Sequence, residues 1–305
     1  MWSRDFDVVT GAFGYTGKYV TRRLLAMGRR VKTLTRLLEP AASLPDGLSV
    51  APLRFDHPAE LVDNLRGAAT LFNTYWVRFP YGEVTYEKAV ENSATLIAAA
   101  KEAGISRIVH ISVTNPSVDS KLGYFRGKAH VEQIITGSGL AYSILRPTVI
   151  FGVEDVLINN IAWLLRHIPV FAIPGGGDYC LQPVFVVDLA EMAVEAGKAN
   201  GSIVLDAVGP ETYAFRDLVQ LIARSVGSRA RIVHLRPTLA LFLSRLVGVA
   251  VRDVVLTAEE VEGLMSGLLV SQGPPSGRTR LTVWVERHAH MLGTRYASEL
   301  RRHYR

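Results

Sequence analysis

The sequence predicts an α/β fold with a doubly wound parallel sheet and a smaller, mostly helical C-terminal region. Short apolar segments of strand length alternate with segments of helical periodicity through the first half of the chain, and after Phe151 this alternation loosens. Three glycines, Gly11, Gly14 and Gly17, lie at the first strand-to-helix junction. Such alternation indicates parallel strands joined by right-handed helical crossovers that cover both faces of the sheet.

The expected elements of the first half follow one another in regular order. Each strand is expected where an apolar or β-branched run occurs, and each helix where apolar residues recur on one face. Glycines in the segments KEAGISR and GSGLAYS stand where helices should end. The expected strands cover residues 6–11, 30–35, 48–55, 69–75, 107–113 and 141–147, and the expected helices cover residues 16–27, 58–65, 83–103 and 124–136.

The second half is expected to return to the same sheet and otherwise to form a cap. We assign residues 1–150 to the sheet domain, with 183–208 returning to its sheet, and residues 151–182 and 209–305 to the cap. From Arg231 on, one short strand and several helices are expected. The elements expected before that point are strands at 183–187 and 202–208 and helices at 188–199 and 214–226.

The composition is that of a folded globular protein. Of the 305 residues, 49% are hydrophobic and 20% are charged, which lies far from the composition of disordered chains. The single cysteine, Cys180, cannot form an intramolecular disulfide, and no Cys/His spacing predicts a metal site. Since no apolar stretch of signal-peptide length precedes the first strand, we expect a cytoplasmic protein.

The charge pattern gives no indication of a nucleic-acid partner. The net charge is +6, but no stretch interleaves Lys and Arg with aromatic residues in the manner of nucleic-acid-binding proteins. The apolar run Leu239–Val251 is about 13 residues long and contains Arg245, whereas roughly 20 residues are needed to span a bilayer. We therefore expect no integral membrane segment, and interpret this run as a core helix, with a membrane-surface or partner-docking helix as the alternative.

The three glycines predict a dinucleotide-binding turn. A strand-to-helix turn built from glycines lets the backbone approach a pyrophosphate, and the amides at the helix start favour its negative charge. A merely tight turn is the alternative, but the strand before it and the helix after it are the context that dinucleotide binding requires. The residues of this turn expected to contact the cofactor are Gly11, Phe13, Gly14, Tyr15, Thr16 and Gly17.

The spacing G-x-x-G-x-x-G resembles that of the short-chain dehydrogenase/reductase superfamily, particularly its extended and atypical branches. Within it, the sequence is most similar to the atypical group that includes the NmrA-like regulators and the short-chain-like accessory subunit of respiratory complex I, which the segment LTAEEVEGLMSGLL (256–269) resembles. The other segments that carry the resemblance are RFD (54–56), LFNTY (71–75), ILRPTVIFG (144–152) and QPVFVVDLAE (182–191).

This resemblance implies a Rossmann domain with a bound nicotinamide dinucleotide. It assigns Asp56 to the position that contacts the adenine and places the loop after the fourth strand, with Asn73 and Thr74, beside the cofactor. Pro147, in the Arg-Pro segment that ends the sixth strand, is a further expected cofactor contact.

The residues after the second strand favour NADP(H) over NAD(H). NAD-binding proteins usually end this strand with a carboxylate that bonds the ribose 2′-hydroxyl. Here the strand ends in Thr35 and Arg36, and the first acid is Glu39. The planar guanidinium of Arg36 suits a 2′-phosphate, and Thr35 could also donate to it. The alternative is that Arg36 is simply exposed to solvent, which leaves NAD(H) open.

Tyr124 and Lys128 form the candidate catalytic pair. They stand four residues apart at a helix start, which places both on one face. The pair opens the helix after the fifth strand, where the superfamily has its Tyr/Lys pair. The resemblance implies that the tyrosine hydroxyl exchanges a proton with the substrate oxygen and that the lysine bonds the nicotinamide ribose. The NmrA-like resemblance leaves the alternative that Lys128 has only a cofactor role.

Four polar or aromatic residues near the same edge of the sheet are weaker candidates. Ser112 or Thr114 would polarise the substrate oxygen, with Thr114 preferred because it lies nearer the mouth of the cleft. Tyr75 and Trp76 either line the substrate or simply pack. His110, inside an apolar strand, is expected to be a core histidine and not a base.

These observations favour an NADP(H)-dependent oxidoreductase of the short-chain type that acts on a small carbonyl or alcohol substrate. One alternative is a non-catalytic NADP(H)-binding regulator or accessory or assembly protein. A second is a nucleotide-sugar epimerase or dehydratase, which the absence of a crisp Ser-Ser/Thr pair and the weak acidic signal after the second strand disfavour. A homodimer formed through the long helices is left open.

Overall fold

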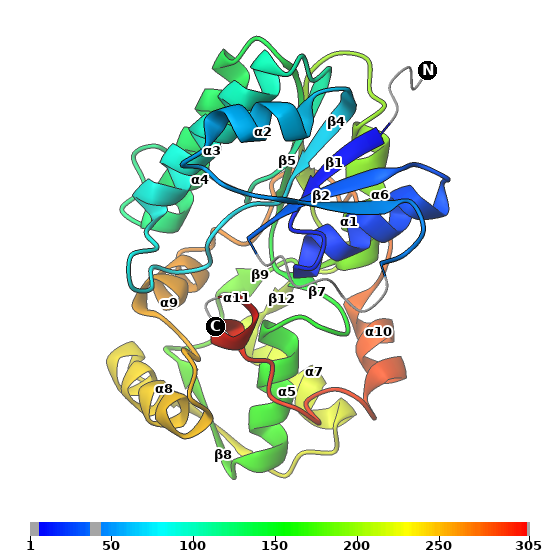
Figure 1. Ribbon diagram of the computed structural model, residues 1–305. Helices are drawn as coiled ribbons and strands as arrows, with labels where there is room; N and C mark the ends of the chain where they lie inside the picture. The colour runs from blue at the N-terminus through cyan, green and yellow to red at the C-terminus, as the bar shows by residue number, and fades with distance from the viewer. Residues whose placement is uncertain (1–5, 37–43, 304–305) are drawn as a thin grey trace. The chain divides into compact units, whose positions relative to one another are not determined.

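The computed structural model describes residues 6–36 and 44–303, which fall into two units (Figure 1). The first unit comprises the chain up to Arg146 together with Val186–Leu205. The second comprises Pro147–Phe185 and the chain from Asp206 on.

A seven-stranded sheet with the order β11-β6-β5-β4-β1-β2-β3 organises the first unit (Figure 1). Neighbouring strands from β3 to β6 run parallel. Every residue of β4 and β5 is buried, as expected for central strands that are covered on both faces. The strands are β1 (Phe6–Thr10), β2 (Val31–Thr35), β3 (Leu48–Pro52), β4 (Ala68–Asn73), β5 (Arg107–Ile111), β6 (Ala141–Pro147) and β11 (Ile203–Ala207).

Helices cover both faces of this sheet. On one face α1 packs against α6, and on the other α3 packs against both α2 and α4 (Figure 1). Leu24, Leu71 and Ile108 are fully buried. Burial of one such side chain contributes about 1.5–3 kcal/mol to folding. The helices are α1 (Tyr15–Ala26), α2 (Pro58–Leu65), α3 (Tyr86–Glu102), α4 (Gly123–Gly137) and α6 (Val186–Ala196).

The strand order creates a topological switch point at one end of the sheet. After β3, at the edge, the chain crosses to the other side of β1 and forms β4. The connections after β1 and β4 therefore lead to opposite faces of the sheet. In doubly wound sheets, ligands bind at such a switch point, beyond the carboxyl ends of the strands.

The second unit combines short strand pairs with helices. Its core surrounds Phe151, Leu218 and Trp284, all buried. The strand pairs are β7 (Ile150–Phe151) with β10 (Val184–Phe185), β9 (Cys180–Leu181) with β12 (Tyr213–Ala214), and β8 (Val170–Pro174) with β13 (Arg231–Leu235). The helices are α5 (Leu157–His167), α7 (Phe215–Ser225), α8 (Pro237–Val251), α9 (Ala258–Met265), α10 (Leu281–His288) and α11 (Glu299–His303).

The predicted fold class is confirmed, and three element boundaries are corrected. The strand expected at 183–187 is shorter in the structure, because it covers only β10 and α6 begins at Val186. In addition, β10 pairs with β7 and does not join the large sheet. A buried apolar run has the same pattern in a strand and in the first turn of a buried helix. The strand expected at 48–55 ends at Pro52, and the helix expected from 83 begins at Tyr86, after the capping residue Thr85.

Within residues 6–36 and 44–303, the structure has no helix with both the length and the apolar character needed to cross a bilayer.

Candidate cofactor and catalytic site

The glycine turn brings the start of α1 against the end of β1. Gly11 has a φ of +69°, in the left-handed region that favours glycine. A Cβ at Gly17 would lie 2.2 Å from the carbonyl oxygen of Gly11, so only glycine permits this contact. Gly14 precedes the helix, and no side chain caps the first turn of α1. The amides of that turn can therefore donate to a diphosphate, and the turn fits a dinucleotide.

The rest of the turn is fixed to the neighbouring strand. The amide of Ala12 donates to Oγ1 of Thr33 in β2 over 3.0 Å. Phe13 is 42% exposed, and Tyr15 and Thr16 are half-buried. The rings of Tyr15 and Tyr19 meet edge to face. The predicted cofactor residues of this segment thus lie together around the start of α1.

Reciprocal hydrogen bonds join the ends of β1 and β4 at the switch point. Oγ1 of Thr10 accepts from the amide of Thr74 over 2.8 Å, and Oγ1 of Thr74 donates to the carbonyl oxygen of Thr10 over 2.6 Å. The side chain of Asn73 is fully buried and lies 3.2 Å from Nδ1 of His110. Asn73 and Thr74, both predicted cofactor contacts, therefore fix the loop after β4 at the switch point.

His110 is confirmed as a core histidine. It is fully buried, and burial together with the nearby charge of Lys128 holds its pKa well below the usual value. The imidazole is therefore neutral across the physiological pH range.

Arg36 and Asp56, predicted for the adenine ribose and the adenine, are exposed at the ends of neighbouring strands. Arg36 follows β2 directly, whereas Glu39 lies outside the described residues. Asp56 follows β3, and its carboxylate lies 3.4 Å from Nε2 of His57. Thr35, the last residue of β2, is 6% exposed. Among the described residues at this end, Arg36 and Arg54 are both exposed cations, and Arg54 pairs with Glu60 over 3.5 Å.

Tyr75 lies close to this end. Its ring centroid is 4.8 Å from that of Phe55, and its hydroxyl accepts a hydrogen bond from Nδ2 of Asn92 over 2.9 Å. Burial raises the pKa of Tyr75, and the Asn92 hydrogen bond and the charge of Arg36 oppose this rise. Tyr75 thus packs beside Phe55 and near Arg36, and its substrate-lining role stays a prediction.

Tyr124 and Lys128 meet on the indole of Trp76. The Lys128 ammonium lies 4.7 Å from the centroid of this ring, a cation–π contact. Tyr124 is half-buried and meets Trp76 edge to face, with ring centroids 6.1 Å apart. A Cβ at Gly127 would lie 2.8 Å from the indole, so this glycine lets Trp76 lie directly on α4. The structure therefore brings the predicted pair together around one aromatic ring.

Burial controls the charge of Lys128. The side chain is 3% exposed, and Nζ donates to the carbonyl oxygen of Ile111 over 2.7 Å. Burial lowers the pKa of Lys128 to about 7, although the charge of Glu132 opposes this shift. Lys128 therefore changes its charge close to neutral pH, as groups with a chemical role often do.

Ser112 and Thr114 differ in what they contact. The hydroxyl of Ser112 donates to Oε1 of Glu132 over 2.5 Å, and Arg146 binds both oxygens of the same carboxylate. Thr114 lies beyond this cluster and is fully buried, and the next residue, Asn115, has a φ of +52°. The Ser112 hydroxyl is thus engaged with Glu132, Thr114 is fully buried, and the roles of both residues stay predictions.

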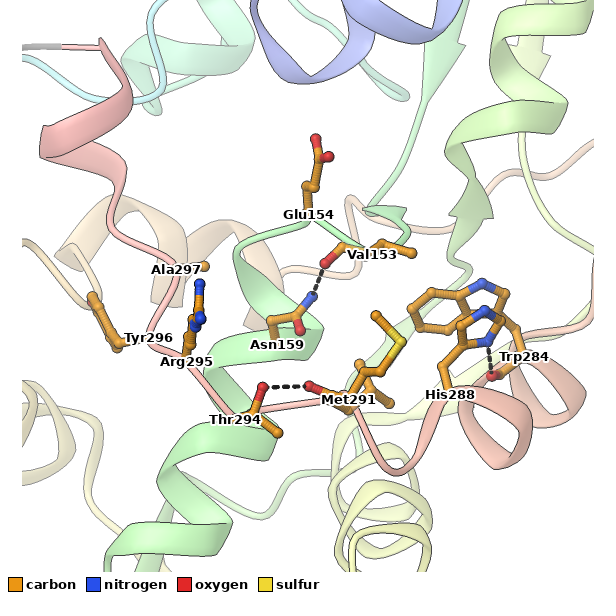
Figure 2. A pocket seen from close by; sticks show the side chains of 11 residues that line it. Val153, Glu154, Asn159, Trp284, His288, Met291, Thr294, Arg295, Tyr296 and Ala297 are labelled. Atoms are coloured by element: carbon orange, nitrogen blue, oxygen red, sulfur yellow. Dashed lines mark hydrogen bonds between the residues drawn. The ribbon is translucent and has the colours of Figure 1, made fainter.

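The second unit contains a pocket of about 600 Å³, shown in Figure 2. Its wall is mixed, with apolar Val153 and Met291 and charged Glu154 and Arg295. Trp284 and His288 stack in it with ring centroids 4.5 Å apart. A pocket of this size and character suits a small organic molecule. The remaining lining residues are Asn159, Leu292, Thr294, Tyr296 and Ala297.

Asp155 fixes the segment that enters this pocket. Its Oδ1 accepts from the amide of Ile158 over 2.6 Å, and its Oδ2 accepts from Nδ2 of Asn159 over 3.0 Å. Burial raises the pKa of Asp155 to about 7. Among the described residues, no cluster of three or more His, Cys, Asp or Glu side chains could hold a metal ion.

Comparison with known proteins shows which family the chain resembles. The sequence profile of an NAD(P)H-binding family matches residues 11–154. Subunit 9 of the mitochondrial NADH dehydrogenase [ubiquinone] 1 alpha subcomplex from Arabidopsis thaliana is 27% identical over 240 residues, which cover 74% of this chain and 59% of that protein. The chain is similar to the NAD(P)H-binding atypical short-chain dehydrogenase/reductases over this part of its length. The predicted resemblance to this branch is thus confirmed.

Two further similar proteins have names that state an enzymatic activity. A 4-hydroxy-2-methyl-3-oxo-4-farnesyl-3,4-dihydroquinoline-1-oxide ketoreductase from Stigmatella aurantiaca is 26% identical over 250 residues, which cover 73% of this chain and 74% of that protein. The crystal structure of an NADPH-dependent quinone oxidoreductase from Escherichia coli, complexed with NADPH, matches with a TM-score of 0.76 and 20% identity, covering 93% of this chain and all of that one. At that identity the structural likeness shows the fold alone.

Several contacts of this site could not be predicted from the sequence. No local pattern indicates that Gly127 contacts Trp76 or that Glu132 pairs with Arg146. The segments 153–159 and 284–297 meet in one pocket although they are far apart in the sequence. Pro147, predicted from the Arg-Pro segment, is the buried last residue of β6.

We expect Gly17→Ala to weaken NADPH binding at least tenfold and to lower the melting temperature, because the new Cβ would overlap the Gly11 backbone. Gly137→Ala is the matched control: it is also a helical glycine, but a Cβ there meets nothing within 4 Å. Calorimetric titration and thermal unfolding of both variants test this. NADPH affinity in Gly17→Ala equal to that of the control would contradict the proposed diphosphate site.

Lys128→Met is expected to stabilise the fold most at pH 7 and below. At pH 7 and below, the folded wild-type protein must bury a charged ammonium, since the pKa of Lys128 in the folded state is about 7. Between pH 7 and the unfolded pKa of roughly 10.4, only the unfolded state keeps the proton, so wild-type stability rises with pH and the advantage of the variant shrinks. Urea unfolding of both proteins from pH 6 to 10 measures the difference. A pH-independent difference would show that Lys128 titrates normally.

Proposed function

We propose that the protein is an NADP(H)-dependent oxidoreductase that transfers hydride between the cofactor and the carbonyl or alcohol carbon of a small molecule. The convergence of Tyr124 and Lys128 on Trp76 carries this proposal. Tyr124 offers a hydroxyl that can exchange a proton, and Lys128 offers a buried amine four residues further along the same helix. The ketoreductase relative supports the same class of reaction.

The residues divide the chemistry between them. When bound, the nicotinamide supplies or accepts the hydride, and with it both electrons. In the reducing direction, Tyr124 gives its hydroxyl proton to the carbonyl oxygen while a C–H bond forms at the carbonyl carbon, and solvent then returns a proton to the phenolate. A charged Lys128 favours that phenolate and can donate to the ribose hydroxyls. Thr114 is the proposed donor to the substrate oxygen.

The pocket of the second unit is proposed, by itself, to bind a small organic molecule. Stacked Trp284 and His288 together with Met291 provide an apolar and aromatic wall, while Arg295 can bind a negative group. This wall suits an aromatic or extended apolar carbonyl compound more than a nucleotide sugar, which needs many polar contacts. A cytoplasmic location and a homodimer remain parts of the proposal.

The preference for NADP(H) is proposed to rest on Arg36. We expect Arg36→Ser to weaken NADPH binding at least tenfold and to change NADH affinity less than threefold, because only NADPH has the 2′-phosphate that the guanidinium would bind. Arg54→Ser is the control, since Arg54 is exposed after β3 and pairs with Glu60. Fluorescence titration with both nucleotides tests this. A parallel loss for NADPH and NADH would refute the assignment.

Tyr124→Phe is expected to lower turnover at least a hundredfold, as general acid–base catalysis contributes about 10²- to 10⁴-fold. NADPH affinity should stay within about threefold, because phenylalanine keeps the edge-to-face packing on Trp76 and loses only the hydroxyl. Turnover is measured with NADPH and a panel of aromatic ketones and quinones, with Tyr142→Phe as the control. Undiminished turnover in Tyr124→Phe would remove this residue from the mechanism.

A non-catalytic accessory protein is the second candidate. Two observations favour it: Nζ of Lys128 is already hydrogen-bonded to Ile111, and the Arabidopsis thaliana relative is a subunit of a larger complex. This function predicts tight NADPH binding without hydride transfer to any carbonyl in the panel, and copurification of a protein partner. Transfer of deuterium from 4-deuterated NADPH to a ketone would exclude it.

A further inference from the structure

One helix of the second unit exposes a continuous apolar face. Residues at intervals of three and four along α8 lie on one side of the helix. Phe242 is 56% exposed, Leu246 is 54% exposed and Val249 is 79% exposed, whereas Ala240 and Gly248 on the other side are buried. The face, which we call the α8 stripe, consists of Leu239, Phe242, Leu243, Leu246 and Val249.

Arginines frame the α8 stripe, and no acid interrupts it. Arg236 caps the start of the helix, Arg245 lies beside the stripe, and Arg252 caps the end. All three are exposed, and the segment 236–252 contains neither Asp nor Glu. Arg252 has a φ of +55°, although this left-handed position favours glycine. Within the segment 236–252 the charges beside the apolar face are therefore all positive, and the acid that follows, Asp253, is buried with its carboxylate bound to the amides of Glu299 and Leu300.

A groove of about 530 Å³ runs beside α8. Arg245 and Arg252 lie at it, while most of its other lining is apolar. Such a groove offers an apolar channel next to two guanidinium groups. Its further lining residues are Leu241, Ser244, Gly248 and Val249 of α8, the segment 253–258, and Leu300.

We propose that the α8 stripe lies in the surface of an anionic phospholipid bilayer, with its arginines on lipid phosphates. The helix has 15 residues, too few to span a bilayer but enough to lie in its plane. Arginine side chains can extend their charged ends to phosphate while their stems stay on apolar surface. Anionic lipids attract such clusters of basic residues.

A bilayer fits this surface better than a second copy of the chain. In a two-fold dimer the same patch meets itself, which would bring like-charged arginines together with no acid in the patch to compensate. A single convex helix with positive borders complements a negatively charged, deformable surface. This inference is independent of whether Tyr124 is catalytic.

The test uses the full chain and sedimentation with vesicles of phosphatidylcholine, with or without phosphatidylglycerol. We expect binding to the anionic vesicles that weakens as salt increases. Phe242→Ser/Leu246→Ser and, separately, Arg245→Gln/Arg252→Gln should each reduce this binding at least tenfold. Val204→Ser, an exposed apolar residue of β11, is the control and should bind as the wild type does. Unchanged NADPH affinity and melting temperature show that the variants are folded.

Three results would overturn the proposal. The first is that the wild-type protein fails to sediment with anionic vesicles. The second is that both double variants bind them as strongly as the control. The third is a wild-type dimer in analytical ultracentrifugation that Phe242→Ser/Leu246→Ser dissociates, without any lipid binding, which would assign the α8 stripe to self-association.

Discussion

The contact between α1 and the end of β1 determines where a cofactor can lie. Because Gly17 has no side chain, the helix start comes within van der Waals distance of the Gly11 backbone, and its first-turn amides face the same end of the sheet as the carboxyl ends of the parallel strands. Thr10 and Thr74 then hold the β4 loop against β1. The residues that follow β2, β4 and β5 consequently lie along one edge, in the order that a dinucleotide would meet them.

The second constraint is the burial of Lys128, because removing a charged amine from water costs free energy. The Ile111 carbonyl, the Trp76 ring and the Glu132 carboxylate each favour the ammonium, yet its pKa still lies at about 7, so desolvation outweighs all three. A residue with only a packing role would be less costly as methionine. The cofactor role proposed for Lys128 would account for this cost equally in an enzyme and in an accessory protein.

The sequence predicts the sheet well because its signals are local. Periodicity located all seven strands of the large sheet and the helices of the first half, and the glycine spacing identified the turn. The contact between Trp76 and Gly127 depends on how the β4 loop crosses α4, which no local pattern encodes. The sequence offered both Ser112 and Thr114 and preferred Thr114, but no local pattern shows that the Ser112 hydroxyl binds the Glu132 carboxylate that pairs with Arg146. At 183–187, the apolar run is compatible both with a strand and with the first turn of a buried helix, so periodicity did not locate the start of α6.

Nucleotide binding by itself does not separate an enzyme from an accessory protein. A ligand that binds only the folded state stabilises it, by about 2.7 kcal/mol when its concentration is a hundred times Kd. A protein that serves as a scaffold can therefore retain the glycine turn and Lys128 for stability after hydride transfer has been lost. Tyr124 is different, because the proposed role of its hydroxyl is to exchange a proton with the substrate and not to bind the dinucleotide. What distinguishes the two functions is therefore whether the Tyr124 hydroxyl transfers a proton, and not whether the cofactor site binds a dinucleotide.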